Sequence, residues 1–444
     1  IFVGMFLLII LDKFERYYIT LASGALVLAL VFGVCMHSMS AIWGTLNLPS
    51  IFTSGFWYGA SEEGNSGINW STIFFIAGMM IMVEGLGKAG FFRWLCLTLA
   101  KLVRYRIVPL LVCFMVLSAV LSMFIDSITV VLFLATVTLE LAQTMKFNPI
   151  PMILSEIFCA NLGGAATMCG DPPNIIVGTS LGYTFFDFIS NTGVAVAICF
   201  VLVLIYFVLC FRKRLLRDEK NSGAAVCPQP GTAITNRPAF LLSAGVFLLA
   251  VILLATHAQT KLTVACIGVI VAALSLVVIG CTSGGKAVLE IIKGVDYKTL
   301  LFFIGLFVSV AGLKETGVLD VIARFITTVS GGNAAIIVVI ILWISAVTSA
   351  FVDNIPFAAT MIPVVRSIAA ASGIDMGVLA WALSLGTDLG GNATPIGASA
   401  NVVGTSVAAK GGYPISWGVY CKYCVGATVL VIAVSMGYLF LRYL

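Results

Sequence analysis

The sequence has 444 residues, of which 61% are hydrophobic and only 10% are charged, and its mean hydropathy is +1.12. A water-soluble domain cannot cover so much apolar surface with polar side chains, so the composition excludes a soluble fold. The net charge of +5 comes from basic residues in short loops, which argues against nucleic-acid binding. The twelve cysteines stand singly in apolar segments, without the paired spacing of a zinc site or a disulfide framework.

Apolar runs of membrane-spanning length recur along the chain, which favours a helical bundle over a barrel of alternating strands. The first half predicts helices near 1–11, 17–36 and 71–87, a basic surface helix near 88–105, two apolar arms at 107–125 and 127–143 joined at Asp126, a segment broken at Gly163–Asn174, and a helix near 192–211. The second half predicts helices at 239–256, 261–280 and 299–313, a hairpin with its tip at Asp353, a segment broken at Gly390–Asn401, and a helix at 418–441.

The two halves repeat one another at a constant offset of 227 residues. The stretch TIFFIAGMMIMVEGLGKAG aligns with TLLFFIGLFVSVAGLKETG, SAVLSMFID aligns with SAVTSAFVD, and NLGGAAT aligns with DLGGNAT, all without a gap. Such duplication is common in transporters, where it places the substrate site between the repeats. We therefore expect an N-terminal repeat at 1–211, a cytoplasmic linker at 212–238 and a C-terminal repeat at 239–444.

Charge distribution predicts that the second repeat is inverted. If each hairpin returns to its own side, each half crosses the membrane an odd number of times, and the second half must run the other way. Placing the basic linker Arg212–Lys220 in the cytoplasm puts 19 of the 24 basic residues inside and five outside, as the positive-inside rule requires. The predicted fold class is an all-α polytopic membrane protein with two inverted repeats, about ten spanning helices, two re-entrant hairpins and two broken helices.

Asp126 and Asp353 are the sharpest candidates for ion binding, because carboxylates within apolar spans are costly and mark ion paths. Each lies at a proposed hairpin tip, in FIDSIT and FVDNIP, where two helix ends leave backbone groups without partners. Alternatively, each aspartate only caps the following helix, helped by Ser127 and Thr129 in one half and by Asn354 in the other. One carboxylate can do both, since its second oxygen stays available for a cation.

The segments NLGGAATMCGDPPN and DLGGNATPIGASAN cannot continue as helices, because their glycines loosen the backbone and their prolines remove donors. In a bilayer, unwound backbone persists only inside protein or beside a wet cavity, where its carbonyls become ion ligands. The residues expected to bind ion or solute are Asn161, Gly163, Gly164, Thr167, Asp171 and Asn174 in the first half and Asp388, Gly390, Gly391, Asn392, Thr394, Ser399 and Asn401 in the second. Oxygen ligands suit Na⁺, which we expect at Asp126, Asn174, Asp353 and Asn401. The alternative is a pair of kinks that neighbouring helices satisfy.

Two further acidic residues leave alternatives open. Glu156 lies five residues before Asn161 on the same helix, and it is either a proton carrier or the partner in a buried hydrogen bond. Asp171, whose mate is Ala398, either makes the two sites different or caps the helix that its two prolines begin. An intramembrane aspartyl protease would need Gly-x-Gly-Asp, whereas MCGD at 168–171 lacks the first glycine, so we expect no enzyme activity and no catalytic residue.

These motifs resemble those of the ion transporter superfamily, and within it the branch of arsenite permeases, NhaD-type sodium/proton antiporters and the melanosomal P protein. The resemblance is carried by NLGGAATMCGDPPNIIV at 161–177, SAFVDNIPFAATMIPV at 349–364 and LGGNATPIGASANVV at 389–403, and is closest to the P protein type. It implies a scaffold domain, a transport domain, an elevator-like movement and a homodimer. Related dicarboxylate transporters carry Ser-Asn-Thr at their hairpin tips. The acidic tips of this chain favour a cation or proton there.

The first functional hypothesis is a secondary active transporter in which Na⁺ or H⁺ drives a small anion or oxyacid across the membrane. The alternatives are a Na⁺/H⁺ antiporter, in which the carboxylates exchange the two cations directly, and an anion channel with a transporter fold. No cofactor is expected besides the coupling ion. The expected partners are membrane lipids, the solute and a second copy of the chain, and the expected location is the plasma (inner) membrane if the source is prokaryotic.

Overall fold

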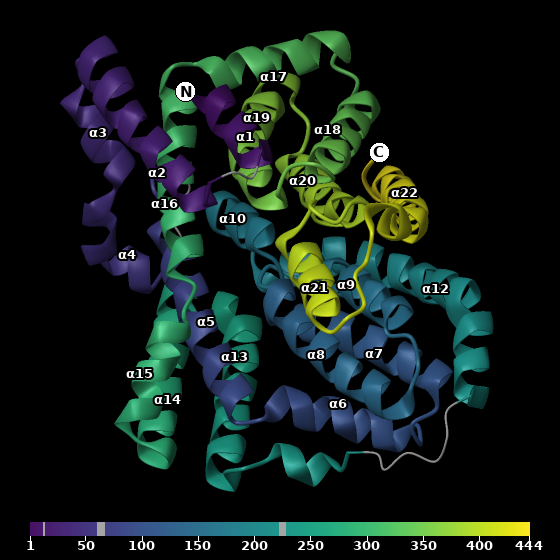
Figure 1. Ribbon diagram of the computed structural model, residues 1–444. Coiled ribbons are helices and arrows are strands. Elements are labelled where there is room, and N and C mark those ends of the chain that lie inside the picture. The colour runs from purple at the N-terminus through teal and green to yellow at the C-terminus, as the bar shows by residue number, and fades with distance from the viewer. Residues whose placement is uncertain (12–13, 60–66, 222–227) are drawn as a thin grey trace.

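The computed structural model describes residues 1–11, 14–59, 67–221 and 228–444. In this part of the chain the regular structure is helical (Figure 1), and a single isolated bridge joins Tyr58 to Leu262. Nine of the described helices are long and apolar enough to cross a bilayer, by length and composition. The prediction of an all-helical, multi-pass membrane protein is therefore confirmed.

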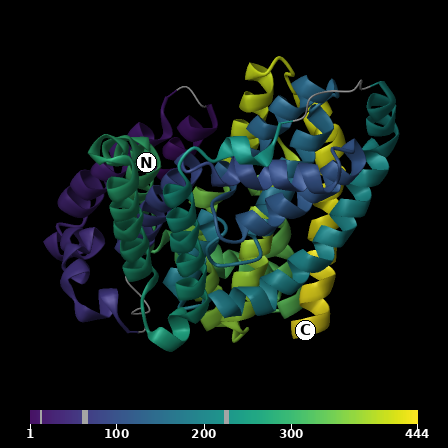
Figure 2. The same cartoon turned by 90° about the horizontal axis from the view of Figure 1, so that it is seen from below.

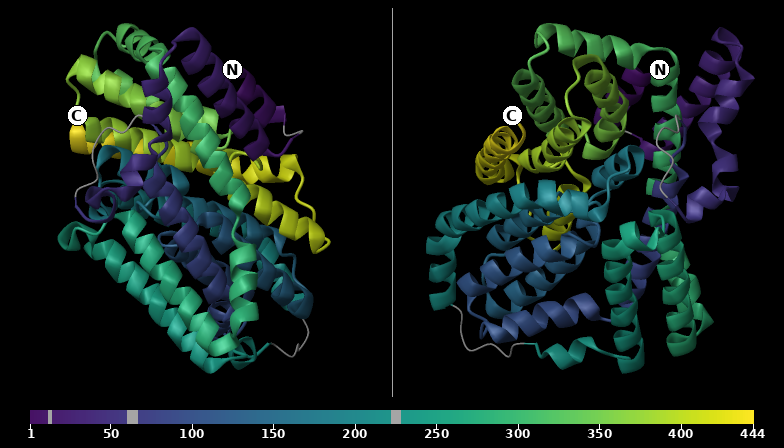
Figure 3. Two further views of the ribbon diagram at one scale, coloured as in Figure 1. Left: turned by 90° about the vertical axis from the view of Figure 1, so that its left-hand side faces the viewer. Right: turned by 180° about the vertical axis from the view of Figure 1, so that it is seen from behind.

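The helix boundaries repeat at the offset seen in the sequence. Four pairs of helices begin and end 227 residues apart: α5 (Trp70–Lys88) and α16 (Tyr297–Glu315), α6 (Phe91–Leu102) and α17 (Val318–Val329), α7 (Ile107–Ser122) and α18 (Ala334–Ser349), and α8 (Ser127–Met145) and α19 (Asn354–Ser372). The broken segments match as α9 (Ile150–Gly164) with α20 (Met376–Gly390) and α10 (Pro172–Leu181) with α21 (Ser399–Lys410). Helices α6 and α17 lie across opposite ends of the molecule (Figures 1 and 3), so the two repeats are inverted relative to each other.

The helices form two groups. The flanking group holds α1 (Phe2–Leu11), α2 (Arg16–Leu26) with its π-helical extension Val27–Cys35, α3 (Met39–Leu46), α4 (Ser54–Trp57), α5, α13 (Arg237–Thr260), α14 (Val264–Ser283), α15 (Gly285–Gly294) and α16. The hairpin group holds α7 to α10, α11 (Phe185–Phe188), α12 (Val194–Asn221), α18 to α21 and α22 (Trp417–Tyr443). Helices α12 and α22 pack together on the edge away from α1 to α4 (Figure 2).

Small residues allow the flanking helices to approach closely. Helix α5 packs on α14 and α2 packs on α16. A Cβ at Gly78 would overlap the backbone of Gly268, and a Cβ at its repeat mate Gly305 would overlap the backbone at Thr20. Between helices in lipid, such close backbone contact supplies the packing that a hydrophobic driving force cannot.

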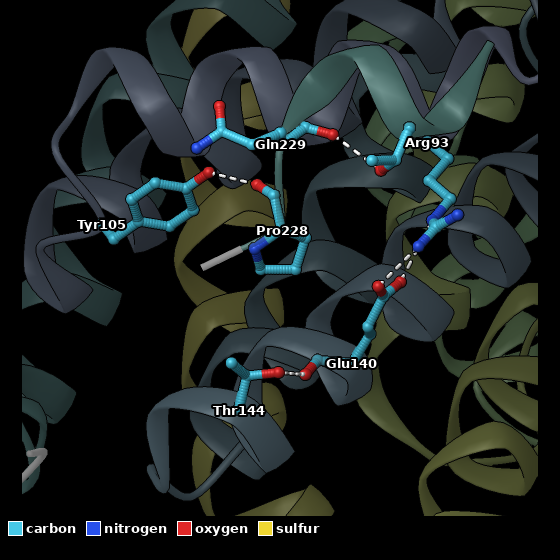
Figure 4. Close-up of polar contacts among 7 residues, drawn as sticks. Arg93, Tyr105, Glu140, Thr144, Pro228 and Gln229 are labelled. Carbon is cyan, nitrogen blue, oxygen red and sulfur yellow. Dashed lines mark hydrogen bonds and ion pairs between the residues drawn. The ribbon is translucent and has the colours of Figure 1, made fainter. Parts of the chain in front are cut away.

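Helices α6 and α17 connect the two groups, and each begins after a glycine in the left-handed region, Gly90 (φ 85°) and Gly317 (φ 73°). Arg93 of α6 makes two hydrogen bonds to Glu140 of α8, of 2.6 and 3.2 Å (Figure 4). The hydroxyl of Tyr105 donates to the carbonyl of Pro228 at 2.6 Å. The first connecting helix is thus attached to the hairpin group, and the turn that follows it is attached to the linker.

Some elements differ from the sequence-based expectation. Helix α12 does not end at residue 211, because it continues through the basic stretch to Asn221, so the proposed linker 212–238 begins as helix. Residues 222–227 of that linker lie outside the described residues, as do residues 60–66, which include Glu62 and Glu63. Helices α3, α4, α15 and α17 were not predicted. In α15, Lys286, Glu290 and Lys293 interrupt the apolar pattern, which made a surface helix resemble a loop.

Candidate functional site

Both hairpin tips are helix caps. The Asp126 carboxylate accepts from the backbone N–H of Thr129 at 3.3 Å and caps α8, and the Asp353 carboxylate accepts from the N–H of Ile355 at 3.3 Å and caps α19. The capping interpretation therefore holds for both residues. The other oxygens differ, because Oδ1 of Asp126 is buried and has no hydrogen-bond partner among the described residues, whereas Oδ2 of Asp353 has two partners.

An asparagine closes each break. Nδ2 of Asn174 donates to the carbonyls of Gly164 and Thr167 at 3.2 and 3.0 Å. Its mate Asn401 donates to the carbonyls of Gly391 and Thr394, both at 2.8 Å. These bonds satisfy carbonyls that the unwound backbone leaves without a helical partner.

Each break is also attached to the first arm of its own hairpin. The hydroxyls of Thr167 and Thr394 donate to the carbonyls of Met123 and Ala350, which are again repeat mates. A Cβ at Gly163 would overlap the backbone of Ala119, and a Cβ at Gly390 would overlap that of Ala346. Only glycine allows this approach, so hairpin and broken segment pack as one unit in each half.

The second arms contact the breaks through serine–aspartate pairs. Oγ of Ser127, beside the first tip, donates to Asp171 Oδ1 at 2.7 Å. At the second tip the roles are exchanged, since Oγ of Ser399 donates to Asp353 Oδ2 at 2.7 Å. Each half therefore has a carboxylate–hydroxyl pair at this place, with the carboxylate on the break in one half and on the tip in the other.

The halves meet through a buried amide network. Nδ2 of Asn161 donates to Oδ1 of Asn392 at 2.9 Å and to Oδ1 of Asn401 at 2.8 Å. A further bond joins the two repeats, since Ser384 of the second repeat donates to Oδ1 of Asn174 in the first at 2.5 Å. In this structure the amide oxygens of Asn174 and Asn401, two of the predicted Na⁺ ligands, both accept hydrogen bonds. A cation at either oxygen would share it with the existing donor.

Asp388 occupies the position of Asn161 in the second repeat but offers no donor. Its carboxylate is fully buried beside the side chains of Asn174 and Asn354, and neither oxygen has a hydrogen-bond partner among the described residues. Nδ2 of Asn174 already donates to two carbonyls of the break. A fully buried carboxylate whose oxygens have no hydrogen-bond partner is a position for a proton or a cation, because a bare buried charge is strongly disfavoured.

Four acidic residues gather here, since Asp126, Asp353 and Asp388 all lie within electrostatic reach of Asp171. Three of them keep a buried oxygen without a hydrogen-bond partner in the described part of the chain: Asp126, Asp171 and Asp388. No three acidic, histidine or cysteine side chains among the described residues are close enough to hold one metal ion together. A cation held by one of these carboxylates would take its other ligands from amide, hydroxyl or backbone oxygens.

A cavity of about 880 Å³ opens between the two groups at the hairpin tips. Asp126, Asp353 and Ser399 line it from the hairpin group, and Arg16 and Lys298 line it from the flanking group. A second cavity of about 510 Å³ lies between the same groups and is lined by Lys314 and Arg366, which the charge distribution assigns to the opposite side of the membrane. The first cavity is therefore the one that faces the predicted cytoplasmic loops.

Arg16 is a functional candidate that the sequence did not single out. Its Nη1 lies 2.5 Å from Oδ2 of Asp353, a residue 337 positions away, and the Asp353 side chain is only 4% exposed. Lys298, in the same cavity, pairs with Glu15 of its own group at 2.7 Å. No sequence pattern links the first residue of the second helix to the tip of the second hairpin, so only the fold could place Arg16 here.

Glu156 lies away from the tips and lines neither cavity described above. It is fully buried on α9, and Oε1 accepts from the hydroxyl of Thr138 at 2.5 Å. Oε2 has no partner among the described residues. The bond of Oε1 agrees with the interpretation of Glu156 as the partner in a buried hydrogen bond. The alternative, that Glu156 carries a proton, stays a prediction.

Three comparisons place the chain among known proteins. A family model described as citrate transporter, CitMHS, matches residues 6–386. The chain is 33% identical to the uncharacterized transporter Rv2684 of Mycobacterium tuberculosis, covering 100% of this chain and 97% of that protein. It is 28% identical to the human P protein over 84% of this chain but 53% of the P protein, about half of its length.

The fold is similar to that of a solved transporter, MtrF of Neisseria gonorrhoeae, assigned to a class of antimetabolite efflux pumps, with a TM-score of 0.60 at 11% identity, covering 100% of this chain and 98% of that one. At that identity the likeness concerns the fold alone. The match to the family model extends over most of the chain, and the transporter relatives agree with it. The chain therefore belongs to the CitMHS citrate transporter family, within the ion transporter superfamily that the broken-segment and hairpin motifs indicated.

Proposed function

We propose that this transporter is a secondary active carrier in which Na⁺ or H⁺ drives a small anion through the cavity at the hairpin tips. The observation that carries the proposal is that Asp126, which keeps a buried oxygen without a partner in the described chain, lines one cavity together with the cationic Arg16 and Lys298 and the N-termini of helices. An uncoupled pore would need neither the buried carboxylates nor two cavities on opposite sides of the membrane.

The cation would bind at carboxylates. Asp126, Asp171 and Asp388 each retain an oxygen that accepts no hydrogen bond within the described residues. Asp388, beside the side chain of Asn174, keeps two oxygens without a partner in the buried centre, where a proton or a dehydrated Na⁺ would compensate the buried charge. A cation at that position would also link the two halves of the hairpin group.

The anion would bind where positive ends converge. Helices α8, α10, α19 and α21 begin at Ser127, Pro172, Asn354 and Ser399, and N-termini of helices carry partial positive charge and free N–H groups. Arg16 and Lys298 add two full charges on the opposite wall. The family description makes tricarboxylates and dicarboxylates the first anions to test. Small oxyacids follow from the arsenite permease resemblance.

The proposed movement is elevator-like, with the hairpin group sliding against the flanking group. Support comes from the two cavities, which lie between the groups on opposite sides. We propose a homodimer, surrounded by lipid. The exposed apolar face of α17, which includes Val321, Phe325 and Val329, fits a helix lying at the lipid interface.

The second candidate is a Na⁺/H⁺ antiporter. It is favoured by Asp126 and Asp388, which offer bare carboxylate oxygens that could exchange the two cations without a solute. Its anion sites would then be unoccupied during transport.

The test uses the purified full chain in proteoliposomes. Uptake of radiolabelled citrate, succinate, phosphate and arsenite is measured under an inward Na⁺ gradient, under a pH gradient and under neither, and luminal pH is followed with no solute present. The proposal expects one anion to accumulate only when a cation gradient is applied. A sodium-driven pH change without any solute would support the antiporter, and anion flux indifferent to both gradients would refute the proposal.

A further inference from the structure

The two hairpin tips are repeat mates, but among the described residues only the second is paired with a cation of the flanking group. Asp126 keeps a buried oxygen with no hydrogen-bond partner in the described chain. Asp353 receives Arg16, whose Nη1 lies 2.5 Å from Oδ2. The pair joins α2 of the flanking group to the tip of α19 in the hairpin group, on the wall of the 880 Å³ cavity.

Asp353 depends on this partner for charge compensation. Its carboxylate also accepts from Ser399 at 2.7 Å and from the N–H of Ile355 at 3.3 Å, but both are neutral donors. With its side chain 4% exposed, Asp353 would be a buried, uncompensated charge if Arg16 left without a replacement. A cation bound at Asp353 is such a replacement.

Arg16 can change partners. Its side chain is 31% exposed on the cavity wall, and a guanidinium binds carboxylate and other oxyanions through two parallel hydrogen bonds. A small anion that enters the cavity can therefore take Arg16 from Asp353. The anion alone leaves Asp353 without its guanidinium, and a cation alone at Asp353 releases Arg16 from that carboxylate, whereas with both present each ligand takes one member of the pair.

We propose that the Arg16–Asp353 pair is the empty form of a two-part site, in which the transported anion binds Arg16 and the coupling cation binds Asp353 by splitting the pair. This inference rests on the proposed function and supplies its coupling step. Each ligand raises the affinity for the other, because an anion that draws Arg16 away leaves the buried Asp353 open to the cation, and a cation at Asp353 releases Arg16 for the anion. Such coupling is reciprocal. The pair also holds the two groups together until both ligands are present.

Lys298 provides the contrast within the same cavity. It pairs with Glu15 at 2.7 Å, but both residues belong to the flanking group and their side chains are 60% and 54% exposed. Splitting such an exposed pair costs little, and it joins nothing across the interface between the groups. Arg16 therefore differs from Lys298 in having a buried carboxylate partner on the hairpin group.

The test measures ligand binding to purified full-length protein, with ²²Na⁺ and radiolabelled citrate as probes, each alone and together, and with citrate binding repeated across a pH series. In Arg16→Gln, ²²Na⁺ should bind about tenfold more tightly without citrate, because no guanidinium competes for Asp353. If H⁺ is the coupling ion, the pH dependence of citrate binding should instead shift toward tighter proton binding. The double variant, in which Asp353→Asn is added to Arg16→Gln, should lose this gain in ²²Na⁺ affinity. Lys298→Gln removes one charge from the same cavity and should weaken citrate binding while keeping its dependence on the cation.

The outcomes separate this inference from the proposed function. If Arg16→Gln keeps wild-type cation affinity and wild-type coupling between the two probes, the pair-splitting site is refuted, while cation-driven uptake by the wild type would still stand. If the wild type shows no cation-driven uptake of any tested anion, the proposed function fails instead. Arg16→Lys keeps the charge without the paired geometry and should retain coupling in weaker form, which excludes misfolding as the cause of the glutamine phenotype.

Discussion

Replacing Asp388 by Asn should make the protein more stable and less responsive to ions. Asp388 lies beside the side chain of Asn174, and neither of its oxygens has a hydrogen-bond partner among the described residues, whereas its repeat mate Asn161 donates to Oδ1 of Asn401 at 2.8 Å. The amide of Asp388→Asn can make the corresponding hydrogen bond and imitates the loaded site. A buried polar group without its hydrogen bond costs about 1–3 kcal/mol, so the substitution should stabilise the ligand-free protein by about that amount.

The assay is thermal unfolding of detergent-purified protein in sodium-free buffer, in sodium and across a pH series. A ligand that binds the native form raises the unfolding midpoint, so the wild type should respond to its coupling ion. Asp388→Asn should begin at a higher midpoint and respond less, and Asp388→Ala, which offers no donor, should gain less stability. The reciprocal change Asn161→Asp should destabilise the protein. A lower midpoint for Asp388→Asn with an unchanged ion response would refute the reasoning.

Three further predictions test the scaffold of the site. Gly390→Ala should cost about 1–3 kcal/mol and lower the yield of monodisperse protein on size-exclusion chromatography, whereas Gly418→Ala, where a Cβ meets nothing, should not; equal behaviour would contradict the close approach. Asn401→Ala should destabilise the protein by about 1–3 kcal/mol for each of the two carbonyls it leaves unpaired, and unchanged thermal stability would argue against its closing role. Exposed Cys281 should react with an impermeant maleimide from the cytoplasmic side and exposed Cys35 from the other, so labelling of both from one side would contradict the predicted topology.

The repeat was the part of the fold most accessible from the sequence. An offset that stays constant over three motifs requires the intervening helices to have equal lengths, and four helix pairs have matching bounds. Breaks at glycine and proline clusters follow from backbone chemistry that is local in sequence. For the same reason the tips at Asp126 and Asp353 were found at the residues that cap α8 and α19.

The unpredicted features depend on contacts between distant segments. The pair between Arg16 and Asp353 spans 337 residues, and neither local pattern nor repeat symmetry indicates it, since Asp126 is the mate of Asp353. The buried amide network joins Asn161 to Asn401 across the two halves. Which carboxylate oxygens remain unpartnered follows from these contacts, so the sequence could name the acidic residues but not distinguish their roles.

The central claim is that the tips and breaks form a carrier in which cation and anion move together. The most direct test measures both fluxes, ²²Na⁺ or H⁺ and the labelled anion, in the same proteoliposomes. The claim predicts a fixed ratio of the two fluxes over a range of gradients, with both lost when either ligand is omitted. Anion flux that continues at full rate after the cation gradient is removed would contradict it.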